Sequence, residues 1–439
     1  MKRLTIKIAS VFFFGIQFYS CNSPDNYNKL EHNNSTPEYL EFLSESQVNV
    51  PVYPLTRGPG YHWFAYYDKY QTDPSDRYVL SMKVDFEHRS PTPDDEIKIG
   101  MIDLKKGGKW IELGTSCAWN WQQGCMLQWR PGSDNEILWN DRVDDRFVCN
   151  ILNVKTREKR TIPSPVYTVS PDGKFALTLD FERVQDVRAG YGYAGIADRN
   201  REKSAPDNAG IYKVSLDDGK KELIVSLEEI ADIPYPLEDL KSYKHYFNAI
   251  NISPDGKRFA FLHRWVVAGE AARISPLGTR FLTASVDGGD IHVINDSRMT
   301  SHFWWKNSQQ ILAWANRPGE GNRFYLFEDN KERSYKVIGE DVLKVDGHCS
   351  YMQNQDWIMN DTYPDENRLV ELYLYNSKTG EKLVLGEFYM DPDYTGEWRV
   401  DLHPRQSRDG KKIIIDCPVG KSGRQMLMLD ISGLGLFQQ

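Results

Sequence analysis

The sequence has few cysteines, no excess of basic residues and no apolar run long enough to cross a membrane. Its six cysteines are one near the N-terminus and five widely spaced others, with no CxxC pair, which excludes a disulfide-stapled domain. The net charge of −8 leaves no basic stripe for phosphates and argues against a nucleic-acid-binding protein. The longest apolar stretch ends after about a dozen residues, whereas a membrane-spanning helix needs about 20.

The N-terminal segment has the order of a signal peptide. Lys2, Arg3 and Lys7 precede the apolar stretch, and Tyr19-Ser20-Cys21 follows it. We predict a lipoprotein signal peptide over residues 1–20, with Cys21 as the lipid-carrying N-terminus; a plain secretory signal is the alternative. Residues 21–49 are then a polar tether, and the protein is a bacterial lipoprotein of the periplasm or outer-membrane surface, held to the membrane by its lipid only.

A repeated turn defines the fold of the remaining chain, residues 50–439. Ser170-Pro171-Asp172-Gly173 recurs at 253–256 and, with Arg for Pro, at 407–410, each copy between two β-branched and aromatic runs. Asp-Gly favours a tight hairpin turn. Weaker copies begin at residues 73, 130, 306 and 352.

Most of the sequence distances between successive turn copies match the roughly 40 to 60 residues of a four-stranded propeller blade. The longest of these distances contains an insertion over residues 198–208. The chain, which contains 12 Trp and 24 Tyr, is therefore predicted to be an all-β, seven-bladed β-propeller; six or eight blades are the alternatives. A strand at 52–55 should close the ring against the blade ending at 426–431. One helical excursion is expected at 223–241.

Three histidines share one position in consecutive blades. His302, His348 and His403 each lie four residues before a turn copy. Equivalent positions of inner strands converge on the axis of a propeller, so these imidazoles are candidate ligands of one divalent metal ion, with His245 as a fourth. Imidazoles suit zinc, manganese, nickel and iron alike. The alternative is that these histidines hydrogen-bond neighbouring blades.

Histidines, tyrosines and arginines gather in the early blades, within residues 61–69 and 85–91, at Tyr167 and within residues 181–183, and these residue types together have the chemistry of β-elimination at a uronic acid. In this reaction an arginine pairs with the sugar carboxylate, a histidine or tyrosine removes the C5 proton, and another protonates the departing O4. No organic cofactor is required. Tyrosines and histidines also occur in propeller cores, and Arg183 in an inter-blade ion pair is the competing interpretation.

Residues 62–69, 167–183 and 189–193 resemble passages of seven-bladed β-propeller polysaccharide lyases, chiefly the ulvan and rhamnose–glucuronate lyases and more distantly the oligogalacturonate lyases. The resemblance implies a lyase that cleaves an anionic polysaccharide or oligosaccharide beside a uronate. It assigns the catalytic site to His62, His88, Tyr167 and Arg183. We further expect Tyr246, Arg264 and Arg399 to bind the substrate.

The competing hypothesis is a non-catalytic, TolB-like propeller that binds a glycan or scaffolds a surface complex. The sequence contains no GxSxG nucleophile motif, and its repeated turn is not the Asp-box of sialidases. Formation of an unsaturated product distinguishes the lyase from the binding protein.

Overall fold

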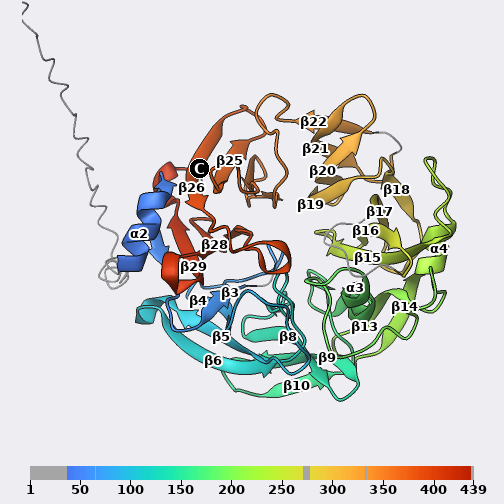
Figure 1. The fold of residues 1–439 in the computed structure, drawn as a ribbon, viewed down its shortest axis with the longest axis horizontal. Helices are drawn as coiled ribbons and strands as arrows, with labels where there is room; N and C mark the ends of the chain where they lie inside the picture. Colours follow the sequence, from blue (N-terminus) through green and yellow to red (C-terminus); the bar gives the residue numbers. More distant parts are fainter. Residues whose placement is uncertain (1–36, 65, 270–276, 332–333, 437–439) are drawn as a thin grey trace, which may run out of the picture.

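Seven antiparallel sheets lie around one axis in the computed structural model, which describes residues 37–64, 66–269, 277–331 and 334–436 (Figure 1). The seven-bladed propeller predicted from the turn repeat is confirmed. In Figure 1, β15 and β19 lie near the middle, and β10, β14 and β22 lie at the rim.

The first four blades each use four consecutive strands. Blade 1 is β3 (Tyr61–Trp63), β4 (Tyr78–Val84), β5 (Ile97–Asp103) and β6 (Lys109–Ser116), and blade 2 is β7 (Gln128–Trp129), β8 (Glu136–Val143), β9 (Arg146–Asn153) and β10 (Lys159–Ile162). Blade 3 is β11 (Thr168–Val169), β12 (Phe175–Thr178), β13 (Gly210–Ser215) and β14 (Lys221–Ser226). Blade 4 is β15 (Tyr243–Ile252), β16 (Arg258–Val267), β17 (Gly278–Ser285) and β18 (His292–Asn295).

The last three blades include two strands from the N-terminal part of the chain. Blade 5 is β19 (Thr300–Asn307), β20 (Gln310–Arg317), β21 (Gly321–Glu328) and β22 (Tyr335–Ile338). Blade 6 is β23 (Ser350–Tyr351), β24 (Trp357–Asp361), β25 (Leu369–Asn376) and β26 (Lys382–Tyr389), with β1 (Gln47–Val48) at its edge. Blade 7 is β27 (Arg405–Gln406), β28 (Lys412–Pro418), β29 (Arg424–Asp430) and β2 (Val52–Pro54).

Ring closure follows the sequence prediction. Strand β2 pairs antiparallel with β29, with Val52 opposite Leu429 and Pro54 opposite Leu427. One blade thus takes strands from both ends of the propeller, which ties the ring together and covers the edge of β29.

The repeated turn has one structure in its three clear copies. Gly173, Gly256 and Gly410 have φ values of 70°, 72° and 73°, which only glycine adopts readily. In the first copy, the Ser170 hydroxyl donates to Asp172 at 2.7 Å and accepts the backbone N–H of Phe175 at 3.1 Å. The sequence repeat therefore encodes a hairpin that connects the inner strand of a blade to the next strand.

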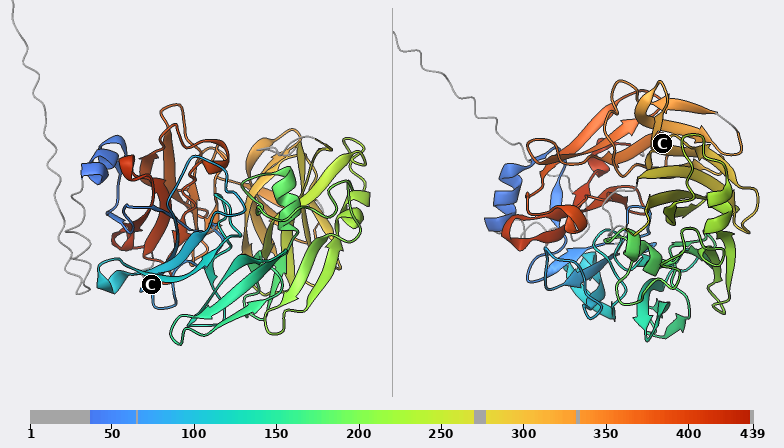
Figure 2. Two further views of the ribbon diagram at one scale, coloured as in Figure 1. Left: turned by 60° about the horizontal axis from the view of Figure 1, so that its bottom comes forward. Right: turned by 45° about the vertical axis from the view of Figure 1, so that its right-hand side comes forward.

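Residues 37–48, which were expected to belong to the polar tether, form ordered structure instead. Helix α2 (Pro37–Glu45) lies at the outer edge of the ring, beside blades 6 and 7 (Figures 1 and 2). Tyr39 and Phe42 are 2% and 1% exposed, and the Tyr39 hydroxyl donates to the carbonyl of Val52 at 2.8 Å. These two apolar side chains, three residues apart, pack the helix against the propeller. Residues 1–36, with the signal peptide and Cys21, lie outside the described residues.

Helices in the blade 3 region also differ from expectation. The helix predicted at 223–241 is reduced to α4 (Leu227–Asp232), because residues 221–226 complete the outer strand β14. Helix α3 (Phe181–Val187) follows β12, at a place where the sequence predicted no helix. The remaining helical turns are η1 (Leu104–Lys106), η2 (Gly396–Trp398), η3 (Gly420–Ser422) and η4 (Ser432–Leu434). Across the described residues, no helix is both long and apolar enough to span a membrane.

Candidate functional site at the propeller axis

The three in-register histidines meet at the axis. The ring centroids of His302 and His348 are 4.1 Å apart, and those of His348 and His403 are 4.3 Å apart. All three side chains are buried, and they enter from blades 5, 6 and 7 at or just before the innermost strand. The blade repeat therefore brings these imidazoles together, as expected from their spacing.

Carboxylates hold two of these imidazoles in a fixed orientation. His302 Nδ1 lies 2.9 Å from Asp346 Oδ1, and His348 Nδ1 lies 3.0 Å from both oxygens of Asp361. Asp361 also accepts the backbone N–H groups of His348 and His403, at 2.6 and 3.2 Å. A carboxylate on Nδ1 leaves Nε2 available as a ligand or base, which is the usual arrangement of the groups that support a metal ligand.

His348, His403 and Asp401 offer ligand atoms that all lie within 4.8 Å of one another. His403 Nε2 is buried without a hydrogen-bond partner, whereas Asp401 Oδ2 is buried and already pairs with Arg399 Nη2 at 2.9 Å. Burial, followed by the charge of His348, lowers the pKa of His403 well below its usual value, so this imidazole is neutral. Two imidazoles and a buried carboxylate fit a divalent transition metal ion.

His245 does not join this cluster. Its Nδ1 lies 2.8 Å from Nε2 of His263, and its Nε2 lies 3.0 Å from the carbonyl of Leu240. Both ring nitrogens are therefore engaged within blade 4 and its preceding loop. The expectation of a fourth metal ligand at this position is corrected, because the side chain turns away from the other three histidines.

Tyrosines surround the histidine cluster. Tyr66 and Tyr67 follow β3, and their ring centroids lie 4.8 Å from that of His403 and 5.3 Å from that of His348, respectively. The ring of Tyr363 lies 6.1 Å from that of His348. Burial raises the pKa of Tyr66 and Tyr67 well above the usual value, so both keep their protons at neutral pH.

Arginines lie next to these tyrosines. Arg399 donates to the Tyr191 hydroxyl at 2.7 Å and pairs with Asp401 at 2.9 Å. The Arg188 guanidinium stands over the Tyr191 ring, 4.0 Å from its centroid. Arg188 Nε and Nη1 are buried without a hydrogen-bond partner, and no carboxylate of the described residues pairs with this side chain. An unpaired guanidinium in such a place indicates a site for an anion.

Tyr246 and Arg264 are two more of the predicted substrate-binding residues, and Tyr246 lies near enough to Arg188 for its charge to act on the pKa of the tyrosine. They lie opposite each other on β15 and β16, so their side chains share one face of blade 4. The Tyr246 hydroxyl and Arg264 Nε are both buried without a hydrogen-bond partner. Among the described residues, Arg264 likewise has no carboxylate partner.

Tyr167 belongs to the same site. Its hydroxyl oxygen accepts from Gln123 Nε2 at 2.8 Å and from the backbone N–H of Ala249 at 3.1 Å, and Lys69 Nζ lies 5.2 Å from its ring centroid. Burial raises its pKa far above the usual value. Burial is the main cause of the raised pKa of Tyr66, and the nearby hydroxyls of Tyr191 and Tyr167 raise it further.

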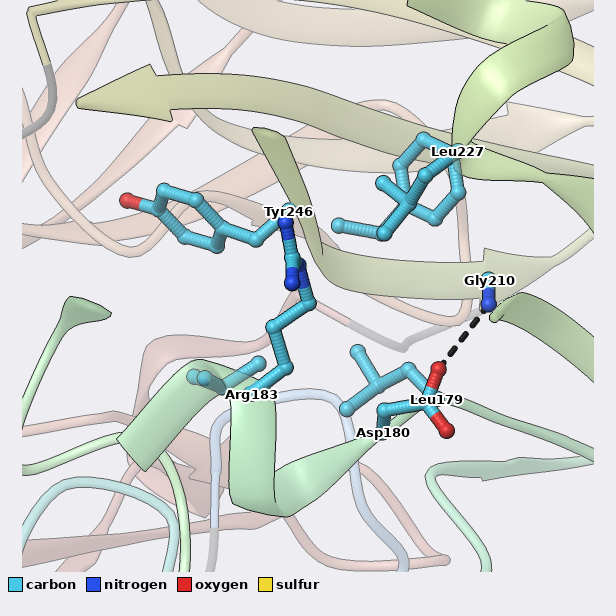
Figure 3. Close-up of a pocket in the computed structure, with 8 residues that line it drawn as sticks. Leu179, Asp180, Arg183, Gly210, Leu227 and Tyr246 are labelled. Carbon is cyan, nitrogen blue, oxygen red and sulfur yellow. Dashed lines mark hydrogen bonds between the residues drawn. The ribbon is translucent and has the colours of Figure 1, made fainter. Parts of the chain in front are cut away.

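Arg183 has a structural role rather than the substrate-binding role expected of it. Its guanidinium donates to the carbonyls of His245, Asn200, Lys203 and Ser204 and pairs with Asp198 at 3.0 Å. The cavity beside it is only about 10 Å³, room for about one water. Figure 3 shows this cavity, in which the Asp180 carboxylate accepts a hydrogen bond from the Gly210 N–H. The Tyr246 hydroxyl points away from the cavity. A sugar carboxylate therefore has no access to Arg183.

His62 and His88 are also placed away from the axis cluster. His62 is 5% exposed and packs edge-on against Trp110, with its Nδ1 3.3 Å from the hydroxyl of Ser81. His88 is exposed in the loop after β4, where its ring packs against that of Tyr394 with centroids 4.8 Å apart and planes inclined by 52°. Of the four residues predicted to be catalytic, the structure brings only Tyr167 to the site.

Several site residues were missed although the sequence carries a signal for them. Asp346 and Asp401 each lie two residues before a clustered histidine, an Asp-x-His repeat in consecutive blades. Tyr66 and Tyr67 stand within the segment that resembles the lyases. Tyr191 lies within residues 189–193, another such segment, whereas Arg188 carries no local signal, because only the tertiary fold brings it beside Tyr191 and Arg399.

Comparison with known proteins shows similarity of fold alone. The chain matches no family model, and no curated protein matches it by sequence. An oligogalacturonate lyase from Vibrio parahaemolyticus gives a TM-score of 0.59 at 12% identity, over 87% of this chain and 93% of that chain. An oligogalacturonate lyase in complex with manganese gives 0.61 at 13% identity, over the same shares of the two chains. TolB from Acinetobacter baumannii gives 0.38 at 14% identity, over 82% and 83%, a TM-score too low to support an argument.

Proposed function

We propose that the chain is a polysaccharide lyase that cleaves beside a uronic acid by β-elimination at the propeller axis. The observation that carries the proposal is the pairing of two features. Arg188 and Arg264 lack an anionic partner among the described residues. Arg188 is linked through Tyr191 and Arg399 to the buried histidine, aspartate and tyrosine cluster, and Arg264 lies opposite Tyr246, on whose pKa Arg188 acts. A bound carboxylate supplies the missing partner.

Carboxylate recognition is assigned to Arg188, Arg264 and Tyr246. Arg188 is close enough to the Tyr246 hydroxyl to act on its pKa, and Arg264 is its cross-strand neighbour. A guanidinium paired with the C6 carboxylate withdraws charge and makes the C5 proton of the uronate acidic. Arg399 is held by Asp401 and Tyr191, so it positions these groups rather than meeting the substrate alone.

Proton transfer is assigned to His302 and Tyr167. Asp346 accepts from Nδ1 of His302, which leaves Nε2 to take the C5 proton. Tyr167 keeps its proton at neutral pH, and its oxygen already accepts two hydrogen bonds. Its own O–H is therefore free to donate a proton to the departing O4. The C5–H and C4–O4 bonds break, C4=C5 forms, and O4 leaves with the tyrosine proton.

A divalent metal ion is assigned to His348, His403 and Asp401. The support is the convergence of three buried ligand atoms, the lack of a hydrogen-bond partner at His403 Nε2, and the fixed orientation of His348 on Asp361. The solved manganese complex of an oligogalacturonate lyase with this fold is consistent with the assignment. Bound there, the cation would neutralise charge that develops on the uronate carboxylate.

The substrate class is an anionic uronate glycan of the ulvan or rhamnose–glucuronate kind. The basic, apolar and Cys21-containing N-terminus supports a lipoprotein on the bacterial envelope, where such a glycan is accessible.

The test is incubation with a panel of uronate polysaccharides and oligosaccharides, following the ultraviolet absorbance of the unsaturated product. We expect product with the unaltered protein and little with Arg188→Gln. Arg298→Gln is the matched control, because Arg298 pairs with Glu238 at the surface and should keep full activity. Binding of a glycan without double-bond formation would instead identify a TolB-like binding propeller.

A further inference from the structure

A second cavity, of about 240 Å³, lies between blades 7 and 1. Its wall comes from the chain that follows β2 and from blade 1: Pro54, Leu55, Thr56, Arg57, His62, Ile102, Gly107, Gly108 and Trp110. None of these residues belongs to the axis site. The cavity includes His62, the motif histidine that the axis site does not use.

Arg57 brings an unpaired charge to this cavity. Its Nη2 is buried without a hydrogen-bond partner, and no carboxylate of the described residues pairs with it. A guanidinium stays charged in proteins, and buried charges are paired in nearly all cases. The wall therefore contains a donor that lacks an anion.

His62 brings an acceptor to the same wall. Its Nδ1 lies 3.3 Å from the Ser81 hydroxyl, which itself donates to the carbonyl of Met82 at 3.1 Å. The Ser81 oxygen is thus the acceptor of the Nδ1–H, and Nε2 carries the lone pair. Burial and nearby Lys83 lower the pKa of His62 to about 3, so the ring is neutral. The lone pair of a neutral Nε2 accepts a hydrogen bond from a ligand hydroxyl and repels an anionic oxygen.

Trp110 adds a flat apolar wall. Its ring lies over Gly100, where a Cβ would come within 2.2 Å of Cζ2, so only glycine permits this position. The His62 ring meets it edge-on with centroids 5.0 Å apart. An indole beside a charged donor and a neutral acceptor matches a ligand that has an apolar ring face, a carboxylate and hydroxyl groups.

We propose that this cavity binds one uronate residue, a hydroxylated sugar carboxylate, independently of the axis site. Arg57 would pair with the carboxylate, His62 Nε2 would accept a sugar hydroxyl, and Trp110 would cover the ring. A cavity of about 240 Å³ has room for a single sugar ring. The proposal stands whether or not the axis site is catalytic.

The test is calorimetric titration with sodium galacturonate, sodium glucuronate, neutral galactose and sodium acetate. It uses an Arg188→Gln background, in which the axis site is weakened. We expect one uronate site in this background and roughly ten- to hundredfold weaker binding when Arg57→Gln is added, because a charge-assisted hydrogen bond is lost. Arg57→Lys should recover only part of the affinity, because an ammonium lacks the planar fork. Added to the same background, Arg298→Gln should leave affinity unchanged.

The remaining measurements distinguish recognition of a sugar acid from simple anion binding. His62→Phe should weaken uronate binding and leave acetate binding unaltered, and galactose should not bind. Thermal denaturation should show Arg57→Gln as stable as the unaltered protein, since Nη2 loses no partner. Equal uronate affinity with and without Arg57, or loss of all uronate binding in Arg188→Gln alone, would overturn the second site and leave the proposed lyase intact. Binding that depends on Arg57 in a protein without lyase activity would retain the site and refute only the proposed function.

Discussion

Asp361→Asn is expected to weaken metal binding at the axis without removing a metal ligand. Asp361 is fully buried and accepts three N–H groups: the imidazole and backbone of His348 and the backbone of His403. Asparagine keeps one oxygen and turns an NH₂ toward at least one of these donors. Each lost charge-assisted bond is worth about 1.5–3 kcal/mol, and loss of a carboxylate that supports a metal ligand typically lowers metal affinity about 10- to 100-fold.

The assay is competition titration of Mn²⁺ and Zn²⁺, with thermal denaturation in parallel. Asp416→Asn is the matched control, because Asp416 is similarly buried but pairs with Arg405 at 2.8 Å in blade 7. Breaking that pair should cost about 3–5 kcal/mol, or roughly 3–5 °C for a chain of 439 residues, and should change metal affinity less than Asp361→Asn does, because Asp416 accepts no N–H from the proposed ligands. Equal metal affinity of Asp361→Asn and the unaltered protein would show that Asp361 does not support a metal ligand.

Three further substitutions test separate parts of the structure. Arg183→Ala should lower the unfolding free energy by about 3–5 kcal/mol in urea titration, because several buried carbonyls lose their donor and Asp198 loses its nearest cation; an unchanged midpoint would contradict the structural role. Tyr167→Phe should slow cleavage about 10²- to 10⁴-fold and lower the unfolding free energy by about 1–3 kcal/mol, because Gln123 and the Ala249 N–H lose their acceptor; full activity would remove its hydroxyl from the reaction. Burial lowers the pKa of His245 to about 4, so its stabilising contribution is complete above about pH 6.5 and is lost as the pH falls toward 4, by up to about 3 kcal/mol. In urea titrations, the unfolding free energy of His245→Gln should fall less between pH 7.5 and pH 4.5 than that of the unaltered protein. An equal fall in both proteins would contradict this assignment.

Local chemistry explains which parts of the fold could be predicted. The Ser-Pro-Asp-Gly turn depends on a few adjacent residues, so its copies set the blade count and, with it, the register of His302, His348 and His403. Ring closure could also be predicted, because a strand before the first blade needs a sheet edge to pair with, and the last blade offers the edge of β29. Repeats were informative because each blade reproduces the same local geometry.

Long-range placement explains the failures. The 16 residues between Tyr167 and Arg183 have the length of two strands, but α3 begins at Phe181 and turns Arg183 into the loop at 198–204. The motif around His62 predicts a place at the axis, but the small residues Ser81 and Gly100 let its ring lie between blades 7 and 1. No local pattern reports which neighbour an inner-strand side chain will face.

Product analysis after digestion of oligogalacturonate, glucuronate-containing rhamnan and ulvan in heavy-oxygen water tests the central claim most directly. β-Elimination predicts new ends that carry a C4=C5 double bond and no oxygen from the solvent, and their formation should disappear in Arg188→Gln. Saturated ends labelled with solvent oxygen, or no cleavage of any uronate glycan by folded, metal-supplied protein, would contradict a lyase at the propeller axis.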